Sequence, residues 1–174
     1  TQKWTLFPYT TLFRSMSEHL AAHEGVINKL KIYHQMVQNE SLKRILSIHI
    51  ITLRHHVAAM LALIDPNRTE KVHLANLPKI PLSEPIGNLT EWEKDIALES
   101  RSSAKLMGTN NYNSASMMKD ENVKSIHVKM AKQDIQLQTM YGRLIKAVNG
   151  DFVPMATPEM QWMTLQKYQH VVNE

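Results

Sequence analysis

Cysteine is absent from this 174-residue chain, and glycine occurs only five times. Without cysteine, the chain has no disulfide, no zinc-thiolate site and no thiol nucleophile. The scarcity of glycine, the concentration of proline mainly in two regions and the eleven methionines favour long helices and leave little sequence for a β-sheet. No apolar run approaches the ~20 residues of a membrane-spanning helix. We therefore expect an all-α protein with no membrane segment.

The motifs of common catalytic sites are missing as well. The sequence contains no glycine-rich phosphate loop, no nucleophile elbow and no His-Glu-x-x-His zinc motif. Its 20 basic and 16 acidic residues give only a mild positive charge, with no Lys/Arg cluster and no RNA-binding aromatic motif. We therefore expect neither an enzyme nor a nucleic-acid-binding protein.

The first fifteen residues differ in character from the rest, because they carry Pro8, no acidic residue and two copies of TLF. They lack the apolar run of a signal peptide, and they do not form the Arg-rich amphipathic helix of a mitochondrial presequence. The stretch TLFPYTTLFRS, residues 5–15, resembles the translation of a common short-read sequencing adapter. We interpret residues 1–15 as non-native and Met16 as the native start, which leaves 18 basic and 16 acidic residues.

Apolar residues recur at spacings of three and four in four segments, each typical of one buried helix face. The predicted helices cover residues 17–37, 42–63, 90–118 and 123–148, with Ser17 opening the first and Glu91 and Glu93 in the first turn of the third. A connector with four prolines, residues 66–89, separates the second helix from the third. Fully extended, it spans up to ~80 Å, so it can travel back along a helix of ~37 Å. Ferritin-like bundles contain one long crossover of this kind.

These patterns predict an all-α, ferritin-like four-helix bundle over residues 16–153, with one long crossover between helices 2 and 3. Residues 154–174 should form a tail with a short C-terminal helix, whose buried side we expect to contain Met160, Met163 and Val171. Trp162 and Tyr168 on that helix are either ordinary packing residues or part of an exposed partner surface. The polar stretch 108–116 predicts a kink or fraying in the third helix.

Histidines and acids occupy several positions on the apolar stripes. If the first hairpin turns near residues 39–40, His23 lies level with His56, and Glu24 lies one step round the helix. In the second hairpin, Glu99 and Asp134 should fall within about one turn of each other. The candidate metal ligands are therefore His23, Glu24, His56 and Glu99, since bundle metal sites are built from facing side chains at one level.

A di-metal carboxylate centre needs a Glu from each of two helices and a Glu-x-x-His motif from each of the other two. Glu24 and Glu99 meet the first half of this requirement. The second half is missing, because the residues three positions before the candidate histidines are Thr52, Leu53 and Lys124. A mononuclear divalent-metal site of His23, Glu24 and His56 remains open. We favour the alternative that the histidines are neutral, hydrogen-bonded core groups and that the chain has no cofactor.

Three segments carry a family resemblance: HEGVINKLKIYHQMVQNESLKRIL (residues 23–46), WEKDIALESRSSAKLM (residues 92–107) and DFVP (residues 151–154). With the Pro-rich crossover, they resemble the ferritin-like spore coat proteins of endospore-forming bacteria related to coat protein F. The resemblance covers residues 16–174. It implies a cytoplasmic origin in the mother cell, deposition in the spore coat, and a structural role in which the chain associates with itself or with other coat proteins. The alternative function is a metal-binding module or oxidase that uses a His/Glu cluster in the bundle.

Overall fold

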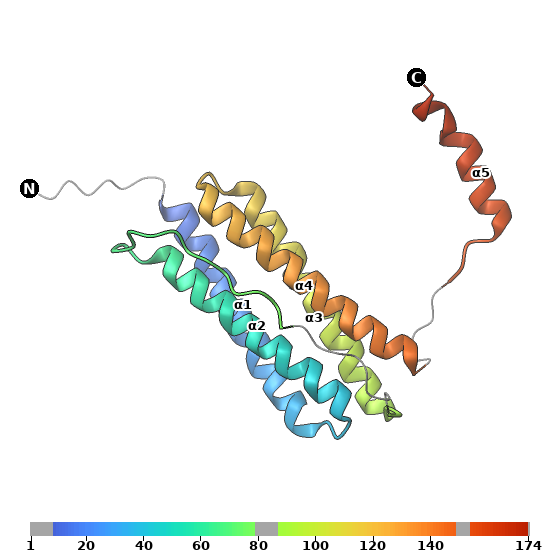
Figure 1. The fold of residues 1–174 in the computed structure, drawn as a ribbon, viewed down its shortest axis with the longest axis horizontal. Helices are drawn as coiled ribbons and strands as arrows, with labels where there is room; N and C mark the ends of the chain where they lie inside the picture. The colour runs from blue at the N-terminus through green and yellow to red at the C-terminus, as the bar shows by residue number, and fades with distance from the viewer. Residues whose placement is uncertain (1–8, 79–86, 149–153, 174) are drawn as a thin grey trace, which may run out of the picture.

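The computed structural model describes residues 9–78, 87–148 and 154–173, and every regular element in these ranges is helical. Two helical hairpins lie side by side and form a four-helix bundle (Figure 1). The first hairpin consists of α1 (Tyr9–Met36) and α2 (Glu40–Ile64), and the second of α3 (Glu91–Met117) and α4 (Glu121–Ala147). A fifth helix, α5 (Pro158–Tyr168), continues into the 3-10 turn η1 (Gln169–Val172). The predicted all-α fold of four long helices and a short C-terminal helix is confirmed.

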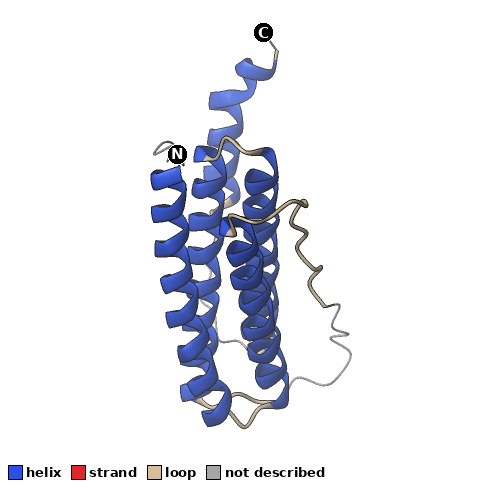
Figure 2. Ribbon diagram, turned by 90° about the vertical axis from the view of Figure 1, so that its left-hand side faces the viewer, coloured by secondary structure: helices blue, strands red, loops and turns tan. Residues whose placement is uncertain are grey.

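The described part of the connection between α2 and α3, residues 65–78, runs along the outside of the bundle (Figure 2). Asn122 of α4 holds it by exchanging hydrogen bonds of 2.9 and 3.0 Å with the backbone of Val72. Further along, Lys129 Nζ donates to the carbonyl oxygen of Leu74 at 2.5 Å, and the Leu74 side chain is buried. This part of the predicted crossover is therefore a strap bound to α4.

Side-chain caps set the starts of the helices after α1. The N-cap residues, whose side-chain oxygens accept a hydrogen bond from a backbone N–H of the first turn, are Asn39, Thr90, Asp120 and Thr157. Thr90 and Glu93 form a reciprocal capping box. The Glu93 carboxylate also accepts backbone N–H bonds from Gln38 and Asn39, at 2.9 and 2.8 Å. One acidic side chain therefore ties the α1–α2 turn to the start of α3.

The first helix begins at Tyr9, eight residues before the predicted start at Ser17. Ser17 does not cap a helix, because its hydroxyl donates to the carbonyl oxygen of Phe13 at 2.8 Å, one turn earlier. The stretch between Tyr9 and Ser17 contains neither proline nor glycine, so the helix extends back through it. Met16 is fully buried, whereas Phe13 is exposed. The interpretation of residues 1–15 as non-native stays a prediction.

The third helix runs without interruption through residues 108–116, so the predicted fraying is wrong, and the alternative of a kink stays a prediction. The buried positions of this stretch are small or polar: Gly108, Asn111, Ser114 and Ala115. A Cβ atom at Gly108 would lie only 3.3 Å from Asp134 Cβ, which shows how closely α3 approaches α4 here. Packing against α4 therefore stabilises a segment that is weakly helical by propensity alone.

The apolar core consists of two main clusters separated along the bundle axis. The cluster nearer the α1–α2 turn includes Leu30, Leu46 and Tyr141, and the cluster at the other end includes Met16, Met60 and Met130. By length and composition alone, α2 is apolar enough to cross a membrane, contrary to the sequence-based expectation. However, 56% of its apolar window is buried inside the bundle, as is usual for a core helix of a soluble protein.

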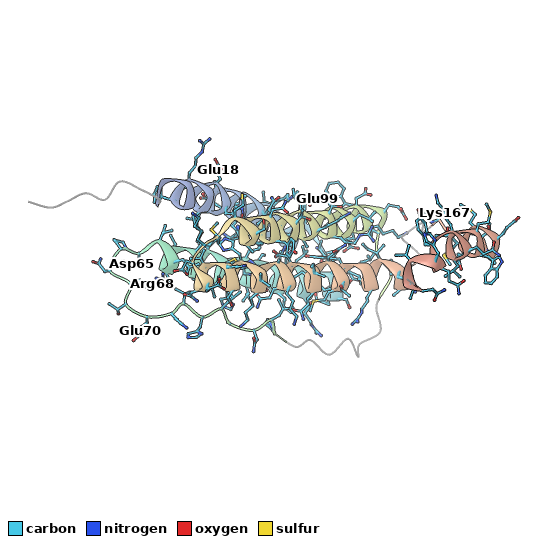
Figure 3. All side chains as sticks on the ribbon, turned by 90° about the horizontal axis from the view of Figure 1, so that it is seen from above. Glu18, Asp65, Arg68, Glu70, Glu99 and Lys167 are labelled. Atoms are coloured by element: carbon cyan, nitrogen blue, oxygen red, sulfur yellow. The ribbon has the colours of Figure 1, made fainter. Side chains whose placement is uncertain are left out.

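Within the described residues, α5 packs only against η1. Figure 1 shows it apart from the four-helix bundle, and Figure 3 labels Lys167 among its side chains. The expected buried side is wrong, because Met160, Met163 and Val171 are 60%, 65% and 59% exposed. Trp162 and Tyr168 are exposed as well. Residues 154–173 thus contribute no described packing to the bundle.

Candidate functional site

Eight polar side chains lie between the two apolar clusters, and we call them the polar layer. They are His19 and His23 of α1, His56 of α2, Asn111 and Ser114 of α3, and His127, Gln133 and Asp134 of α4. Apart from the half-buried His19, none is more than 5% exposed. The ring centroids of His23 and His56 are 5.6 Å apart, and the ring of His19 lies 6.3 Å from His23 and 5.8 Å from His127. All four long helices therefore contribute to one buried polar site.

The hairpin of α1 and α2 brings the two central histidines together. A short turn centred near Asn39 fixes the register, so that His23 on α1 faces His56 on α2, as the sequence predicts. The ring atoms His23 Nε2 and His56 Nδ1 are 3.4 Å apart. His19 precedes His23 by four residues, which places both rings on the same face of α1.

The partners of the outer ring nitrogens fix the positions of the protons. His23 Nδ1 lies 2.7 Å from the carbonyl oxygen of His19, which only accepts, so Nδ1 carries the hydrogen. His56 Nε2 lies 2.9 Å from Gln133 Oε1. The amide nitrogen of Gln133 donates to the carbonyl oxygen of Ala75 on the strap at 2.6 Å, so its oxygen faces His56 and Nε2 donates to it. Each neutral ring therefore donates outward.

The inner ring nitrogens consequently present two lone pairs to each other. Neither His23 Nε2 nor His56 Nδ1 carries a hydrogen in the neutral ring, so the 3.4 Å contact between them is not a hydrogen bond. Asp134 Oδ1 lies 3.9 Å from His56 Nδ1 and has no hydrogen-bond partner among the described atoms. Asp134 Oδ2 accepts a 2.8 Å hydrogen bond from Asn111 Nδ2. His56 Nδ1 therefore has an imidazole nitrogen and a carboxyl oxygen as neighbours.

Burial keeps all three groups uncharged. Desolvation lowers the pKa of His23 to about 4 and the pKa of His56 to about 3. The same effect raises the pKa of Asp134 to about 8, although the hydrogen bond from Asn111 opposes this shift. At neutral pH the two rings are neutral and the carboxyl group is protonated. Its proton resides on Oδ1, because Oδ2 faces the donating amide of Asn111.

The other two predicted metal ligands lie elsewhere. Glu24 is exposed on α1. Glu99 Oε1 accepts hydrogen bonds from Lys29 Nζ at 2.5 Å and from Ser103 Oγ at 2.9 Å, and the Glu99 side chain is 41% exposed. Within the described ranges, no group of three or more His, Asp or Glu residues could hold a metal ion. The polar layer contains one carboxyl group, so a di-metal carboxylate centre does not fit it.

The prediction that Glu99 and Asp134 lie within one turn is wrong. Asp134 instead meets Asn111, which is twelve residues beyond Glu99 on α3. The close approach at Gly108 sets a register between α3 and α4 that the turn position does not reveal. Sequence reasoning therefore missed Asn111 and Gln133 as parts of the site. A polar stretch within a helix and an acid on an apolar stripe were the available signals.

A second buried histidine, His49, lies outside the polar layer. Its Nδ1 is 3.2 Å from the hydroxyl oxygen of Tyr141, and its Nε2 has no described partner. Burial lowers the pKa of His49 to about 3. His49 is therefore buried on the same helix as His56, but no second imidazole faces it.

Comparisons with known proteins add no relative: no family model, no curated protein and no solved structure matches this chain.

Proposed function

We propose that this chain is a non-enzymatic structural protein that assembles with further copies of itself through its C-terminal helix. The observation that carries the proposal is the isolation of α5. This helix has eleven residues and packs only against η1 within the described chain. Isolated helices shorter than ~12–15 residues are marginal in water. Contacts outside a single bundle would therefore stabilise α5.

The side chains of α5 support the same conclusion. Met160 and Met163 lie on one side of the helix, and Trp162 and Leu165 lie on the opposite side, all of them 59–65% exposed. Apolar side chains on two opposite sides of an exposed helix leave apolar surface that contacts with another chain could cover. The bundle offers apolar side chains to receive it, because Leu106 and Ile135 on the second hairpin are 61% and 55% exposed. A second copy therefore carries both a tail helix and a surface that α5 could cover.

The setting we propose for this assembly is the spore coat, after synthesis in the mother-cell cytoplasm. This part of the proposal rests on the resemblance of residues 23–46 and 92–107 to spore coat proteins related to coat protein F. Other coat proteins would be further partners of the same kind. The all-α bundle is compatible with this setting.

Measuring the size of the purified protein tests the proposal. We expect the full chain to form oligomers in sedimentation or light-scattering experiments and the chain lacking residues 155–174 to be monomeric. Trp162→Gln should weaken assembly, whereas the control Trp92→Gln should not, because Trp92 is a comparably exposed tryptophan (53%) on the bundle. A full chain that remains monomeric at high concentration, or a truncated chain that still forms oligomers, contradicts assembly through α5.

A further inference from the structure

The solvent face of α4 carries positive charge without any negative charge beside it. Exposed residues follow one another there at spacings of three and four, so they form a single stripe along the helix. We call it the α4 stripe, and its members are Lys124, Val128, Lys132, Ile135, Thr139, Arg143 and Lys146. The four cations are scattered along the sequence, and the helix gathers them on one face. At 1.5 Å per residue, the stripe is about 33 Å long.

The positive charge of the α4 stripe is not neutralised within the described chain. None of its four cations forms an ion pair with a described residue. After Glu121, the first residue of α4, the only acid of this helix is Asp134, which is buried. Solvent-facing helix surfaces usually carry both signs, because opposite charges one turn apart stabilise a helix and like charges destabilise it. An anionic partner would therefore stabilise the stripe from outside.

Two apolar side chains lie between the cations. Val128 and Ile135 are 45% and 55% exposed, and they are two helical turns apart on the same face. Ile135 lies at the close approach of α3 and α4, because its Cγ1 would be 3.6 Å from a Cβ atom at Gly108. Protein interfaces combine apolar contacts at the centre with charged residues at the rim. The α4 stripe has this composition, and its spacing matches that of an amphipathic helix.

Other occupants fit the stripe less well. The chain itself offers no matching acidic helix, since α5 contains a single acid, Glu159. Four acids on the long helices already pair with cations of their own chain, namely Glu18, Glu40, Glu91 and Glu99. A bilayer would need a free apolar face for insertion, but the apolar face of α4 is buried in the bundle. The stripe also has no aromatic side chain on which nucleic-acid bases could stack.

We propose that the α4 stripe binds an acidic amphipathic helix of a different protein. The carboxylates of that helix pair with the four cations, and its apolar residues cover Val128 and Ile135. Complementary charge speeds the encounter and fixes the register of the two helices. Ile135 is the one residue that the stripe shares with the surface offered to α5 of a second copy. The cations and Val128 belong to the stripe alone, so this proposal does not depend on assembly through α5.

Titration of the full chain with a synthetic peptide tests the proposal. The probe is a helical peptide of about 22 residues, the length of the stripe, with glutamates and leucines on one face at spacings of three and four. A scrambled peptide of the same composition keeps the charge but loses the face. We expect one peptide to bind per chain at about 0.15 M salt, and the scrambled peptide to bind at least about tenfold more weakly. Equal binding of the two peptides, or no binding of either, overturns the proposal.

Charge reversal locates the bound peptide. Lys132→Glu combined with Arg143→Glu should weaken peptide binding at least about tenfold, because two attractions become repulsions. The matched control is Lys31→Glu combined with Arg54→Glu, which changes the net charge equally at exposed positions of the first hairpin. This control should bind the peptide within about threefold of the unsubstituted chain. Equal losses in the two double variants would show that only the net charge matters and would refute the stripe.

Two further measurements separate this proposal from the alternatives. Duplex DNA and vesicles of phosphatidylcholine and phosphatidylglycerol in equal parts are titrated in the same way as the peptide. Tighter binding of either than of the peptide assigns the stripe to another class of partner and overturns the proposal. Light scattering of the Lys132→Glu, Arg143→Glu variant should show the same oligomer as the unsubstituted chain. A changed oligomer would place the two cations in the self-assembly interface and contradict a separate partner.

Discussion

Replacing Glu93 by glutamine should destabilise the bundle far more than its position in the first turn of a helix suggests. The side chain is 5% exposed and accepts four hydrogen bonds. Two come from the backbone N–H groups of Gln38 and Asn39, and two come from the N–H and hydroxyl of Thr90. Glutamine has a single acceptor oxygen, so Glu93→Gln leaves at least one part-buried backbone N–H facing an amide donor.

The magnitude follows from these contacts. A buried donor without a partner costs about 1–3 kcal/mol, and the surviving bonds lose the additional strength that a charged acceptor gives them. We expect Glu93→Gln to lower the free energy of unfolding by about 2–4 kcal/mol. Glu91→Gln is the matched control, because Glu91 is also in the first turn of α3 but its described ion pair, with Lys94, leaves its side chain 88% exposed. That control should cost at most about 1 kcal/mol.

Urea unfolding followed by circular dichroism measures both variants, with stability taken from the midpoint at a common slope. Acid provides a second check. Burial alone would raise the pKa of Glu93, but the hydrogen bonds from Thr90, Asn39 and Gln38 outweigh it and hold the pKa below 4.5. A lowered folded-state pKa stabilises the protein fully above the unfolded value and loses this contribution as the pH falls. The difference in free energy of unfolding between the original chain and Glu93→Gln should therefore become smaller below about pH 4.5. If Glu93→Gln and Glu91→Gln lower the free energy of unfolding equally, the hydrogen bonds of Glu93 do not have the stabilising role described here.

Two further predictions concern the close helix contact and the N-terminal segment. Gly25→Ala should stabilise the protein by about 0.5–1 kcal/mol, because its new Cβ meets no atom within 4 Å. The free energy of unfolding of Gly108→Ala should be at least about 1 kcal/mol lower than that of Gly25→Ala, since the new Cβ at position 108 would press on α4. Equal urea midpoints for the two variants would contradict the close contact. A chain that starts at Met16 should melt within about 2–4 °C of the full chain, because the described side-chain contacts that it loses are both exposed: the ion pair Arg14–Glu18 and the hydrogen bond from the Ser17 hydroxyl to the Phe13 carbonyl oxygen. A larger drop in a calorimetric scan would show that the residues before Met16 are part of the folded domain.

The fold was largely accessible from the sequence because its signals are local. Spacings of three and four define each helix, and the polar turn near Asn39 and the cap at Thr90 define helix ends within one or two residues. The same short turn fixes the register of α1 against α2. For that reason the contact between His23 and His56 could be predicted from residue numbers alone, without any knowledge of the second hairpin.

The rest of the site depends on contacts that no local signal encodes. Asp134 meets Asn111 because α3 and α4 approach closely at Gly108, and the length of the turn between the helices does not specify that register. Gln133 holds His56 only because the strap supplies the Ala75 carbonyl oxygen that orients its amide. Glu93 presents a similar case, since the sequence indicates a favourable first-turn acid but not its bonds to the α1–α2 turn.

The polar layer lowers the stability of the bundle, because some of its buried polar atoms have no described hydrogen-bond partner. Each buried polar atom without a hydrogen-bond partner costs about 1–3 kcal/mol, and Asn111 Oδ1 and Asp134 Oδ1 both lack a described partner. Well-packed apolar side chains of similar volume often stabilise a core as well as buried polar groups do, or better. Assembly through α5 involves only the outside of the bundle, so it gives no reason to keep the layer. Replacing both His56 and Asp134 by leucine should therefore leave the oligomer unchanged in light scattering, whereas loss of the oligomer would show that the layer serves assembly after all.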